Sequence, residues 1–352
     1  MKPVSMRVPP KPVRRLLFGP AVVVLAVVMV TTAPLVLLLV GVAALIPRIG
    51  RITRVVAFIA FYIVLEAIAL VCLFGLWIAS GFGYAIRSAS FRNGHYRLAG
   101  WLLRIIERQL RWSMRLRIIV GDETEEATIS DAPVILASRH AGPGDSLVLV
   151  HLLLNHYHRR PRIILKDTLQ WDPMIDVMLN RLEMVFITPT PFYPSRSAPR
   201  GPRPIERISK MAEKMGPRDA LVLFPEGGNF TLGRRAARIQ QLRDGGGADS
   251  LALRAAAMPN VMAPRPGGLF AAVDACPEAG ILFVGHTGLE ELSSVRALWR
   301  SLPVRKTIAL KSWYVASEDI PEEWTSRVSF LYDAWATLDD WIGETDVAAL
   351  DT

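Results

Sequence analysis

The chain has 352 residues, 51% of them hydrophobic, and its mean hydropathy is positive, which excludes a disordered or collagen-like polymer. Its formal net charge of +9 is unevenly distributed, because residues 1–120 carry 16 Lys and Arg against 2 Asp and Glu. Arginines in this basic part flank long apolar runs, a pattern that favours an anionic membrane surface over nucleic acid as the partner.

The cysteine content indicates the compartment of the protein, and the arginine content indicates its source. Cys72 and Cys276 are the two cysteines of the chain, so the sequence predicts no disulfide framework and no zinc quartet, and a reducing compartment is expected. The basic side chains are 34 Arg against 7 Lys in an Ala-rich background, which is typical of a GC-rich bacterial gene.

Two long apolar runs near the N-terminus predict membrane helices. Residues 16–46 contain no charge and residues 55–86 contain only Glu66, and both exceed the roughly 20 residues that span a bilayer. A cleaved signal peptide is shorter, so we expect a permanent anchor. Gly19-Pro20 and Pro34 interrupt the first run and positive residues flank every end, so two spans and a re-entrant hairpin both stay open. Glu66 is either a functional carboxylate in the membrane or a group that snorkels or pairs with an arginine.

From about Phe91 the apolar stretches shorten to strand length, which is typical of a soluble α/β domain. Residues 96–117 predict a basic amphipathic helix that lies against the membrane or docks on the domain. Strands are expected at residues 117–120, 133–138, 162–165, 184–188, 220–224, 260–263, 281–284 and 307–315. Six prolines in residues 189–204 predict a long loop.

The first motif with chemical potential is the turn Ser138-Arg139-His140-Ala141-Gly142-Pro143-Gly144-Asp145, between an expected strand and an expected helix. Active sites of α/β folds lie at such turns. The turn brings an imidazole and a carboxylate together, and the carboxylate can fix the tautomer of the ring, so His140 is a candidate general base. The alternative is that Asp145 only caps the following helix.

The second motif, Phe224-Pro225-Glu226-Gly227-Gly228-Asn229, also follows an expected strand. Two glycines after a carboxylate allow backbone N–H groups to converge on an anion or an oxyanion. The alternative is an ordinary glycine turn with a solvated Glu.

The two motifs together, in this order, resemble the glycerophospholipid acyltransferases, the family that includes the 1-acylglycerol-3-phosphate acyltransferases. The resemblance covers roughly residues 85–345. It extends to the segments Lys166-Asp167-Thr168-Leu169 with Pro173, Met184-Val185-Phe186-Ile187, Val261 to Gly268, and the Trp-rich tail Trp324 to Trp341.

The resemblance implies an α/β fold, with a central mixed sheet flanked by helices and preceded by an N-terminal hydrophobic helical hairpin in the membrane. We expect a membrane anchor over residues 1–90, an acyltransferase domain over 91–316 and a C-terminal helical extension over 317–352. The expected location is the inner membrane of a bacterium, with the catalytic domain in the cytoplasm.

The resemblance also implies roles for the motif residues. His140 would take the proton of an acceptor hydroxyl and Asp145 would orient its ring, without a covalent enzyme intermediate. The donor would be acyl-CoA or acyl carrier protein, the acceptor a lysophospholipid, and no metal or further cofactor is expected. Glu226 would bind the acceptor, and the backbone of Gly227 and Gly228 would stabilise the oxyanion.

Two departures from the family pattern concern phosphate binding. Thr188-Pro189 stands where the family has Asp-Arg, and Gly228-Asn229 stands where it has Thr-Arg, so two arginines that bind anions are missing. The candidates to replace them are Arg196, Arg200, Arg203, Arg207 and Arg265. For each one a solvated surface position is the alternative, and the acceptor could also lack a phosphomonoester.

Two other functions stay open. Gly144-Asp145-Ser146-Leu147 matches the nucleophile block of a serine esterase family, although no Asp-x-x-His follows late in the chain. A non-catalytic lipid or acyl-thioester binder is the second alternative. His151, His156 and His158 lack the spacing of a zinc helix, and His286 is interpreted as a structural histidine or as a residue that lines the substrate groove.

Overall fold

The structure is a computed structural model that describes residues 8–43, 50–121, 132–142, 144–187, 204–244, 249–288 and 307–345. The chain divides into two compact units. The first combines Met1–Met114 with Ile163–Ser197, and the second combines Arg115–Arg162 with Ala198–Thr352. The chain therefore passes from one unit to the other more than once, and the division into ranges 1–90, 91–316 and 317–352 stays a prediction.

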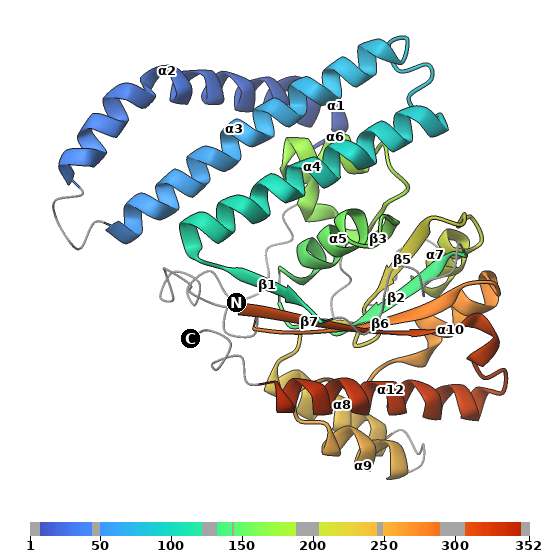
Figure 1. Cartoon of the computed structure of the whole chain (residues 1–352). Helices are drawn as coiled ribbons and strands as arrows, with labels where there is room; N and C mark the ends of the chain where they lie inside the picture. The colour runs from blue at the N-terminus through green and yellow to red at the C-terminus, as the bar shows by residue number, and fades with distance from the viewer. Residues whose placement is uncertain are drawn as a thin grey trace. The chain divides into compact units, whose positions relative to one another are not determined.

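The first unit begins with helices (Figure 1). They are α1 (Lys11–Val13), the π-helical turn η1 (Arg14–Phe18), α2 (Gly19–Ala43), α3 (Gly50–Ala79) and α4 (Ala89–Met114). The wider turn ends two residues before Pro20, which has no N–H to donate and whose ring would clash with the carbonyl group four residues earlier in a regular helix. Pro34 does not break the first run, since α2 continues through it and is bent in Figure 1.

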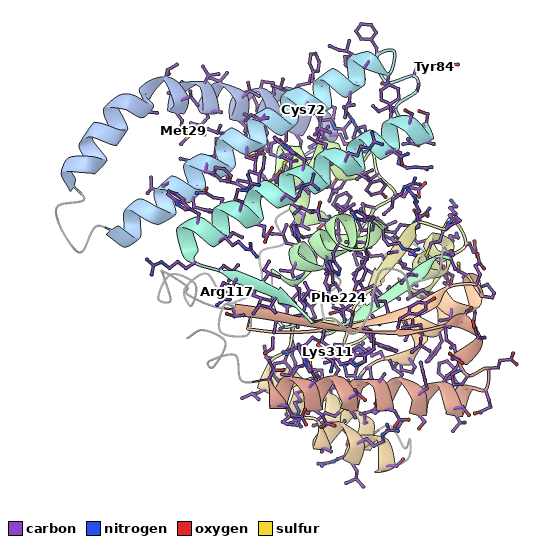
Figure 2. The ribbon with its side chains drawn as sticks, in the orientation of Figure 1. Met29, Cys72, Tyr84, Arg117, Phe224 and Lys311 are labelled. Carbon is purple, nitrogen blue, oxygen red and sulfur yellow. The ribbon has the colours of Figure 1, made fainter. Side chains whose placement is uncertain are left out.

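Helix α2 packs along α3, so the expected hydrophobic hairpin is present within this unit (Figure 1). The segments Lys11–Ala33 and Val56–Ala79 are long and apolar enough to cross a membrane. Many apolar side chains of both helices are exposed, among them Val24, Val27 and Val71. Cys72, labelled in Figure 2, is also exposed on α3, whereas Cys276 is buried, and both are free thiols.

Helix α4 starts seven residues before the predicted helix and ends three residues before its predicted end. Its apolar face, which includes Tyr96, Leu102 and Ile106, is buried, and α4 packs on α3. Its exposed face carries Arg97, Trp101, Arg104, Arg108 and Trp112. The helix is therefore amphipathic as predicted, with a docked apolar face and a basic face with two tryptophans.

The rest of the first unit is a short segment of the expected acyltransferase domain. It contains the end of strand β3 (Arg160–Lys166), the 3-10 helix η3 (Asp167–Trp171), α6 (Pro173–Leu179) and β4 (Val185–Ile187), which pairs in parallel with β3. Helices η1, α2 and α3 all contact α6. Asp172 caps α6 by accepting a hydrogen bond from the Ile175 N–H at 2.8 Å, and Pro173 follows at the first helical position.

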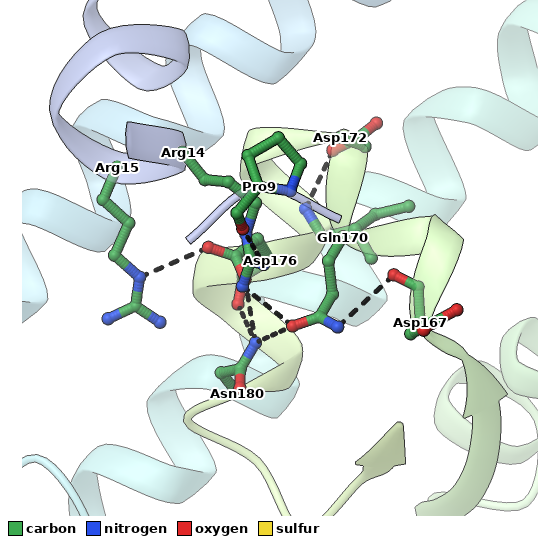
Figure 3. Close-up of polar contacts among 9 residues, drawn as sticks. Pro9, Arg14, Arg15, Asp167, Gln170, Asp172, Asp176 and Asn180 are labelled. Atoms are coloured by element: carbon green, nitrogen blue, oxygen red, sulfur yellow. Dashed lines mark hydrogen bonds and ion pairs between the residues drawn. The ribbon is translucent and has the colours of Figure 1, made fainter. Parts of the chain in front are cut away.

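A buried ion pair links the start of the chain to α6 (Figure 3). Arg14 donates to Asp176 at 2.6 Å and to the Gln170 side chain at 2.9 Å, and Arg15 contacts the second oxygen of Asp176 at 3.3 Å. The Asp176 side chain is fully buried and that of Arg14 is 6% exposed. Asn180 donates to Asp176 at 3.0 Å, so the buried carboxylate has several polar partners.

Two polar side chains of α3 bind the start of α6. Tyr62 donates a hydrogen bond to Asp172, and the Met174 N–H lies 3.5 Å from the Glu66 carboxylate. Glu66 is 6% exposed and no arginine pairs with it among the described residues. In this structure Glu66 therefore docks α3 on α6, and the predicted alternative of an arginine partner is not observed.

The second unit contains a mixed sheet in which β6 and β7 run antiparallel, whereas the pairs β1–β7, β2–β5 and β2–β6 are parallel. Its strand order is β1-β7-β6-β2-β5, followed by the first residues of β3. The bounds are β1 (Arg117–Val120), β2 (Val134–Ser138), β5 (Asp219–Leu223), β6 (Gly280–Thr287) and β7 (Thr307–Val315). The three central strands β2, β5 and β6 are buried along their whole length, as their continuous apolar runs predict.

Helices cover both faces of this sheet, so the predicted α/β class is confirmed. They are α5 (Asp145–Asn155), α7 (Pro204–Ala212), α8 (Leu232–Asp244), α9 (Asp249–Ala257), α10 (Pro266–Ala275) and α12 (Trp324–Glu344). In Figure 1, α12 lies along one face and α5 on the other. Trp335 of α12 is fully buried and packs edge-on against Phe283 of β6, with ring centroids 6.3 Å apart.

One predicted strand is wrong. Residues 260–263 form no strand, although Val261 to Ala263 are buried, because side chains bind two of the backbone N–H groups in this segment. The Asn260 N–H donates to Asp339 at 2.6 Å and the Met262 N–H donates to Glu226 at 3.0 Å. The predicted loop over residues 189–204 lies outside the described residues, apart from Pro204.

We predict that Asp176→Asn destabilises the protein far more than Asp274→Asn. Removing one partner of a buried pair costs about 3–5 kcal/mol, because Arg14 would stay buried with its charge uncompensated. Asp274 is 60% exposed in its pair with Arg327, and exposed pairs contribute about 0–1 kcal/mol. Thermal unfolding in one detergent measures both variants, and equally small losses of melting temperature would contradict the buried pair.

Candidate active site

The two motifs meet at one edge of the sheet in the second unit. Strands β2, β5 and β6 are mutually parallel, so their carboxyl ends lie at the same edge. His140 follows β2, Phe224 to Gly227 follow β5, and His286 is near the end of β6. This edge is where ligands bind in open α/β sheets.

His140 and Asp145 form a hydrogen-bonded pair. The His140 Nδ1 lies 2.8 Å from Asp145 Oδ2, and the Gly142 N–H donates to the same oxygen at 2.8 Å. Asp145 is the first residue of α5, but Gly144 is the N-cap residue and the Asp145 side chain turns back to the loop. The alternative that Asp145 only caps the helix is therefore not what the structure shows.

The carboxylate of Asp145 is fully buried. Burial by itself would raise the pKa of Asp145, but the hydrogen bond from His140, the charge of His286 and the Gly142 N–H together lower this pKa below its ordinary value. Asp145 also lies in the first turn of α5, where the helix dipole favours a negative charge. The site therefore holds an ionised aspartate against the ring of His140.

The ring of His140 is partly accessible. Its side chain is 18% exposed, and it stacks on Phe224 with ring centroids 4.5 Å apart and an interplanar angle of 24°. Phe224, which directly follows β5, is labelled in Figure 2. Because Asp145 binds Nδ1, the nitrogen that is left to accept a proton is Nε2. Stacking and the Asp145 bond together fix the plane of the ring.

Glu226 is turned into the protein. It is 3% exposed, one carboxylate oxygen accepts the His140 N–H at 3.1 Å and the other accepts the Met262 N–H at 3.0 Å. Burial raises the pKa of Glu226 to about 7, although the Met262 and His140 N–H groups and the charge of Arg139 act in the opposite direction. In this structure the Glu226 carboxylate therefore links the backbone of His140 to that of Met262, in the segment after α9.

Two arginines stand against the glycine turn. Gly227 has a φ of +73°, which favours glycine, and a Cβ there would lie 3.2 Å from Arg265 Nε. A Cβ on Gly228 would lie 3.3 Å from Arg234 Nη1. Among the described residues neither arginine pairs with a carboxylate. The glycine turn therefore has two positively charged side chains beside it. Arg265 was a candidate from the sequence, whereas Arg234 was not.

The turn also limits which backbone groups can bind an oxyanion. The Gly227 N–H donates to the Phe224 carbonyl at 3.0 Å, and the Phe230 N–H donates to the His140 carbonyl at 2.5 Å. Within the part of the chain that the structure describes, the Gly228 N–H has no protein acceptor. Of the two predicted glycines, Gly228 is the one whose N–H is available.

The other predicted residues are not all placed. Arg196, Arg200 and Arg203 lie outside the described residues, and Arg207 lies on α7. Ser146 is the second residue of α5 and is not hydrogen-bonded to a histidine in the described structure. No group of three or more His, Cys, Asp or Glu side chains among the described residues is placed to hold a metal ion.

Arg139 and His286 also lie at the site, and no pattern in the sequence predicted that they contact each other. Arg139 and His286 are each 1% exposed and contact each other's backbone carbonyl groups, with Arg139 Nη1 3.1 Å from the His286 oxygen. They are 147 residues apart. A histidine at the end of a buried strand was visible in the sequence, but its neighbour in space was not.

The family model described as Acyltransferase matches residues 119–282. A search of the curated proteins finds no match. One solved structure that matches is the crystal structure of the 1-acyl-sn-glycerophosphate (LPA) acyltransferase PlsC from Thermotoga maritima, with 14% identity, 80% of this chain and 98% of that chain covered, and a TM-score of 0.47.

The family match spans both motifs, from strand β1 to strand β6. It includes His140, Asp145 and the Phe224 to Gly227 turn that the resemblance rested on. The resemblance read from the sequence is thereby confirmed, because residues 119–282, which contain both motifs, match the acyltransferase family model.

Proposed function

We propose that the chain is a membrane acyltransferase that moves a fatty acyl group from acyl-CoA or acyl carrier protein to the hydroxyl of a lysophospholipid such as 1-acylglycerol-3-phosphate. The observation that carries this proposal is the His140–Asp145 pair, with Nδ1 bonded to a buried carboxylate and the ring partly exposed. The family match supports the transfer reaction. The substrates are inferred from the chemistry of the site and from the resemblance.

The proposed reaction is a direct transfer. His140 Nε2 takes the proton of the acceptor hydroxyl as its oxygen attacks the thioester carbonyl carbon. The tetrahedral intermediate then expels the thiolate, which takes the proton from Nε2, so the ring returns to its neutral state. Asp145 holds the Nδ1–H tautomer and stabilises the transient imidazolium through its 2.8 Å bond.

The glycine turn supplies the groups that meet negative charge. The available Gly228 N–H is the candidate donor to the oxyanion. Arg265 and Arg234, which flank the turn without carboxylate partners, are the candidates to bind a phosphate of the acceptor. Gly228 leaves the space that Arg234 occupies, so an arginine from α8 stands near the position where the family has its Thr-Arg pair.

The hydrophobic hairpin supports a membrane location for this activity. The exposed apolar surfaces of α2 and α3 suit a lipid environment, and the lysolipid acceptor is itself a membrane component. We propose that the hairpin sits in a bacterial inner membrane with the second unit in the cytoplasm, since the basic residues of the first 120 positions favour the cytoplasmic side.

We predict that His140→Ala lowers kcat by about 10²–10⁴-fold, because general base catalysis contributes about that factor. Asp145→Asn should also lower kcat, since an amide cannot hold the ring in the required tautomer with a negative charge. Ser146→Ala should retain activity, because Ser146 takes no part in direct transfer. Labelled acyl-CoA and a panel of lysolipids, presented to the protein in membranes, measure transfer and hydrolysis together.

Two results would favour the other functions. Loss of activity in Ser146→Ala with release of free fatty acid would identify an esterase. Thioester that stays bound and intact with every acceptor would identify a binder without turnover. Transfer that continues undiminished in His140→Ala would contradict the proposed base.

We predict that Arg265→Gln raises KM for a lysophospholipid with a free phosphate by about tenfold or more. A hydrogen bond to a charged group is worth about 1.5–3 kcal/mol, and 1.4 kcal/mol corresponds to tenfold. KM for monoacylglycerol, which has no phosphate, should change little. Arg243→Gln, at the exposed far end of α8, is the matched control. Equal changes of KM for both acceptors would contradict a phosphate contact.

We predict that Glu226→Gln removes a pH dependence of stability. The pKa of Glu226 is about 7 in the folded protein and near 4.5 in a free side chain, so the folded state keeps a proton that the unfolded state releases. This term therefore lowers the free energy of unfolding of the wild type as pH rises from about 4.5 to 7, by about 3 kcal/mol.

Unfolding of wild type and Glu226→Gln between pH 4.5 and 8 measures this term. The difference between the two curves should change over that range and stay level above it. Other titrating groups are present in both proteins and cancel in the difference. Parallel curves would show that the Glu226 carboxyl ionises normally in the folded protein.

A further inference from the structure

Arg139 and His286 hold each other at the ends of adjacent strands. Arg139 Nη1 donates to the His286 carbonyl at 3.1 Å, and His286 Nε2 lies 3.3 Å from the Arg139 carbonyl. Arg139 directly follows β2 and precedes His140, and His286 is the last residue but one of β6. Both side chains are 1% exposed. The reciprocal bonds thus fix the backbone from which His140 extends.

The same imidazole approaches the carboxylate of the pair. His286 Nε2 lies 3.8 Å from Asp145 Oδ2, the oxygen that accepts the His140 ring. Among the described residues, His140 and His286 are the two basic groups within ion-pair distance of Asp145. Arg139 contacts the region through its backbone and its guanidinium, and Glu226 reaches it through the His140 N–H.

The acceptors around His286 indicate that its Nε2 is protonated. The Arg139 carbonyl and the Asp145 carboxylate are both acceptors, so Nε2 carries a hydrogen that is directed at one and near the other. A fully buried aspartate needs such donors to stay ionised. Its partners His140, Gly142 and His286 come from the turn and from β6.

We propose that His286 is a positioning residue, which holds the Arg139 carbonyl and the Asp145 carboxylate so that Asp145 keeps the His140 ring in the Nδ1–H form. This inference rests on the proposed acyl transfer, because it assigns the residue that orders the base. His286 touches neither substrate in this scheme and acts through Asp145 and the turn. A displacement of about 1 Å in a catalytic group can cost about 10²-fold in rate, so loss of this support should appear in kcat.

The test compares two substitutions of His286 with a matched control. His286→Leu removes the N–H at similar volume, whereas His286→Gln keeps an amide N–H₂ that can donate to the Arg139 carbonyl. Tyr157→Phe is the control, because it deletes a buried hydrogen bond of the same unit, 2.7 Å to Ser312, away from Asp145. All proteins are full-length, in the same detergent or lipid discs.

Two readouts separate positioning from general stability. Steady-state kinetics give kcat and KM for donor and acceptor. Nitrogen NMR of the protein with ¹⁵N-labelled histidine reports the tautomer of His140, with the His140→Ala spectrum used for assignment. This second readout needs no turnover.

We expect His286→Leu to lower kcat by about 10–100-fold with KM changed less than about twofold, and to convert His140 from the Nδ1–H form to a mixture. His286→Gln should recover most of kcat and the Nδ1–H form, and Tyr157→Phe should alter neither. If the tautomer shifts as expected while the wild type transfers no acyl group, the positioning role stands and the proposed function falls. If His286→Leu keeps the Nδ1–H form and normal kcat, even with a lower melting temperature, the positioning role is overturned.

Discussion

The hydrogen bond between His140 Nδ1 and Asp145 Oδ2 is the interaction on which the functional interpretation depends. A neutral imidazole has one donor and one acceptor nitrogen, and the 2.8 Å bond to a fully buried carboxylate decides which is which. The accessible Nε2 is then left as the acceptor for a substrate proton. Three neighbouring contacts hold the pair in place. Phe224 stacks on the ring, the Gly142 N–H donates to the carboxylate, and Glu226 accepts the backbone N–H of His140.

Buried polar side chains connect distant segments of the chain within each unit. In the second unit, Glu226 and Asp339 accept backbone N–H groups of an apolar segment that would otherwise be left unsatisfied. In the first unit, Asp176 accepts from Arg14 at the start of the hydrophobic helices (Figure 3). Polar residues at the start of the chain and on α3 therefore bind α6, the helix that follows strand β3 in the same unit. Buried groups of this kind are costly unless they are paired, which is why each of these carboxylates has polar partners.

Much of the fold followed from local sequence patterns, and much of the site did not. Residues 307–315 were predicted to be a strand with the bounds that the structure gives, and the apolar runs of β2, β5 and β6 were recognised because a buried strand needs no contact partner to be visible. The segment 260–263 looked like another such strand, but its N–H groups bind Asp339 and Glu226, which are distant in sequence. The inward orientation of Glu226, the approach of Arg234 to Gly228 and the Arg139–His286 pair are likewise set by tertiary packing, which no spacing of residues records.

The most direct measurement of the central claim is chemical rescue of the base. His140→Gly leaves a space where the ring stood, next to Phe224 and Asp145. If the ring removes the proton of the acceptor hydroxyl, added imidazole should restore part of the acyl transfer of this variant in proportion to its concentration, with no effect on the wild type. A variant that stays inactive at every imidazole concentration while folded, or that transfers acyl groups without imidazole, would contradict the role of His140 as the base.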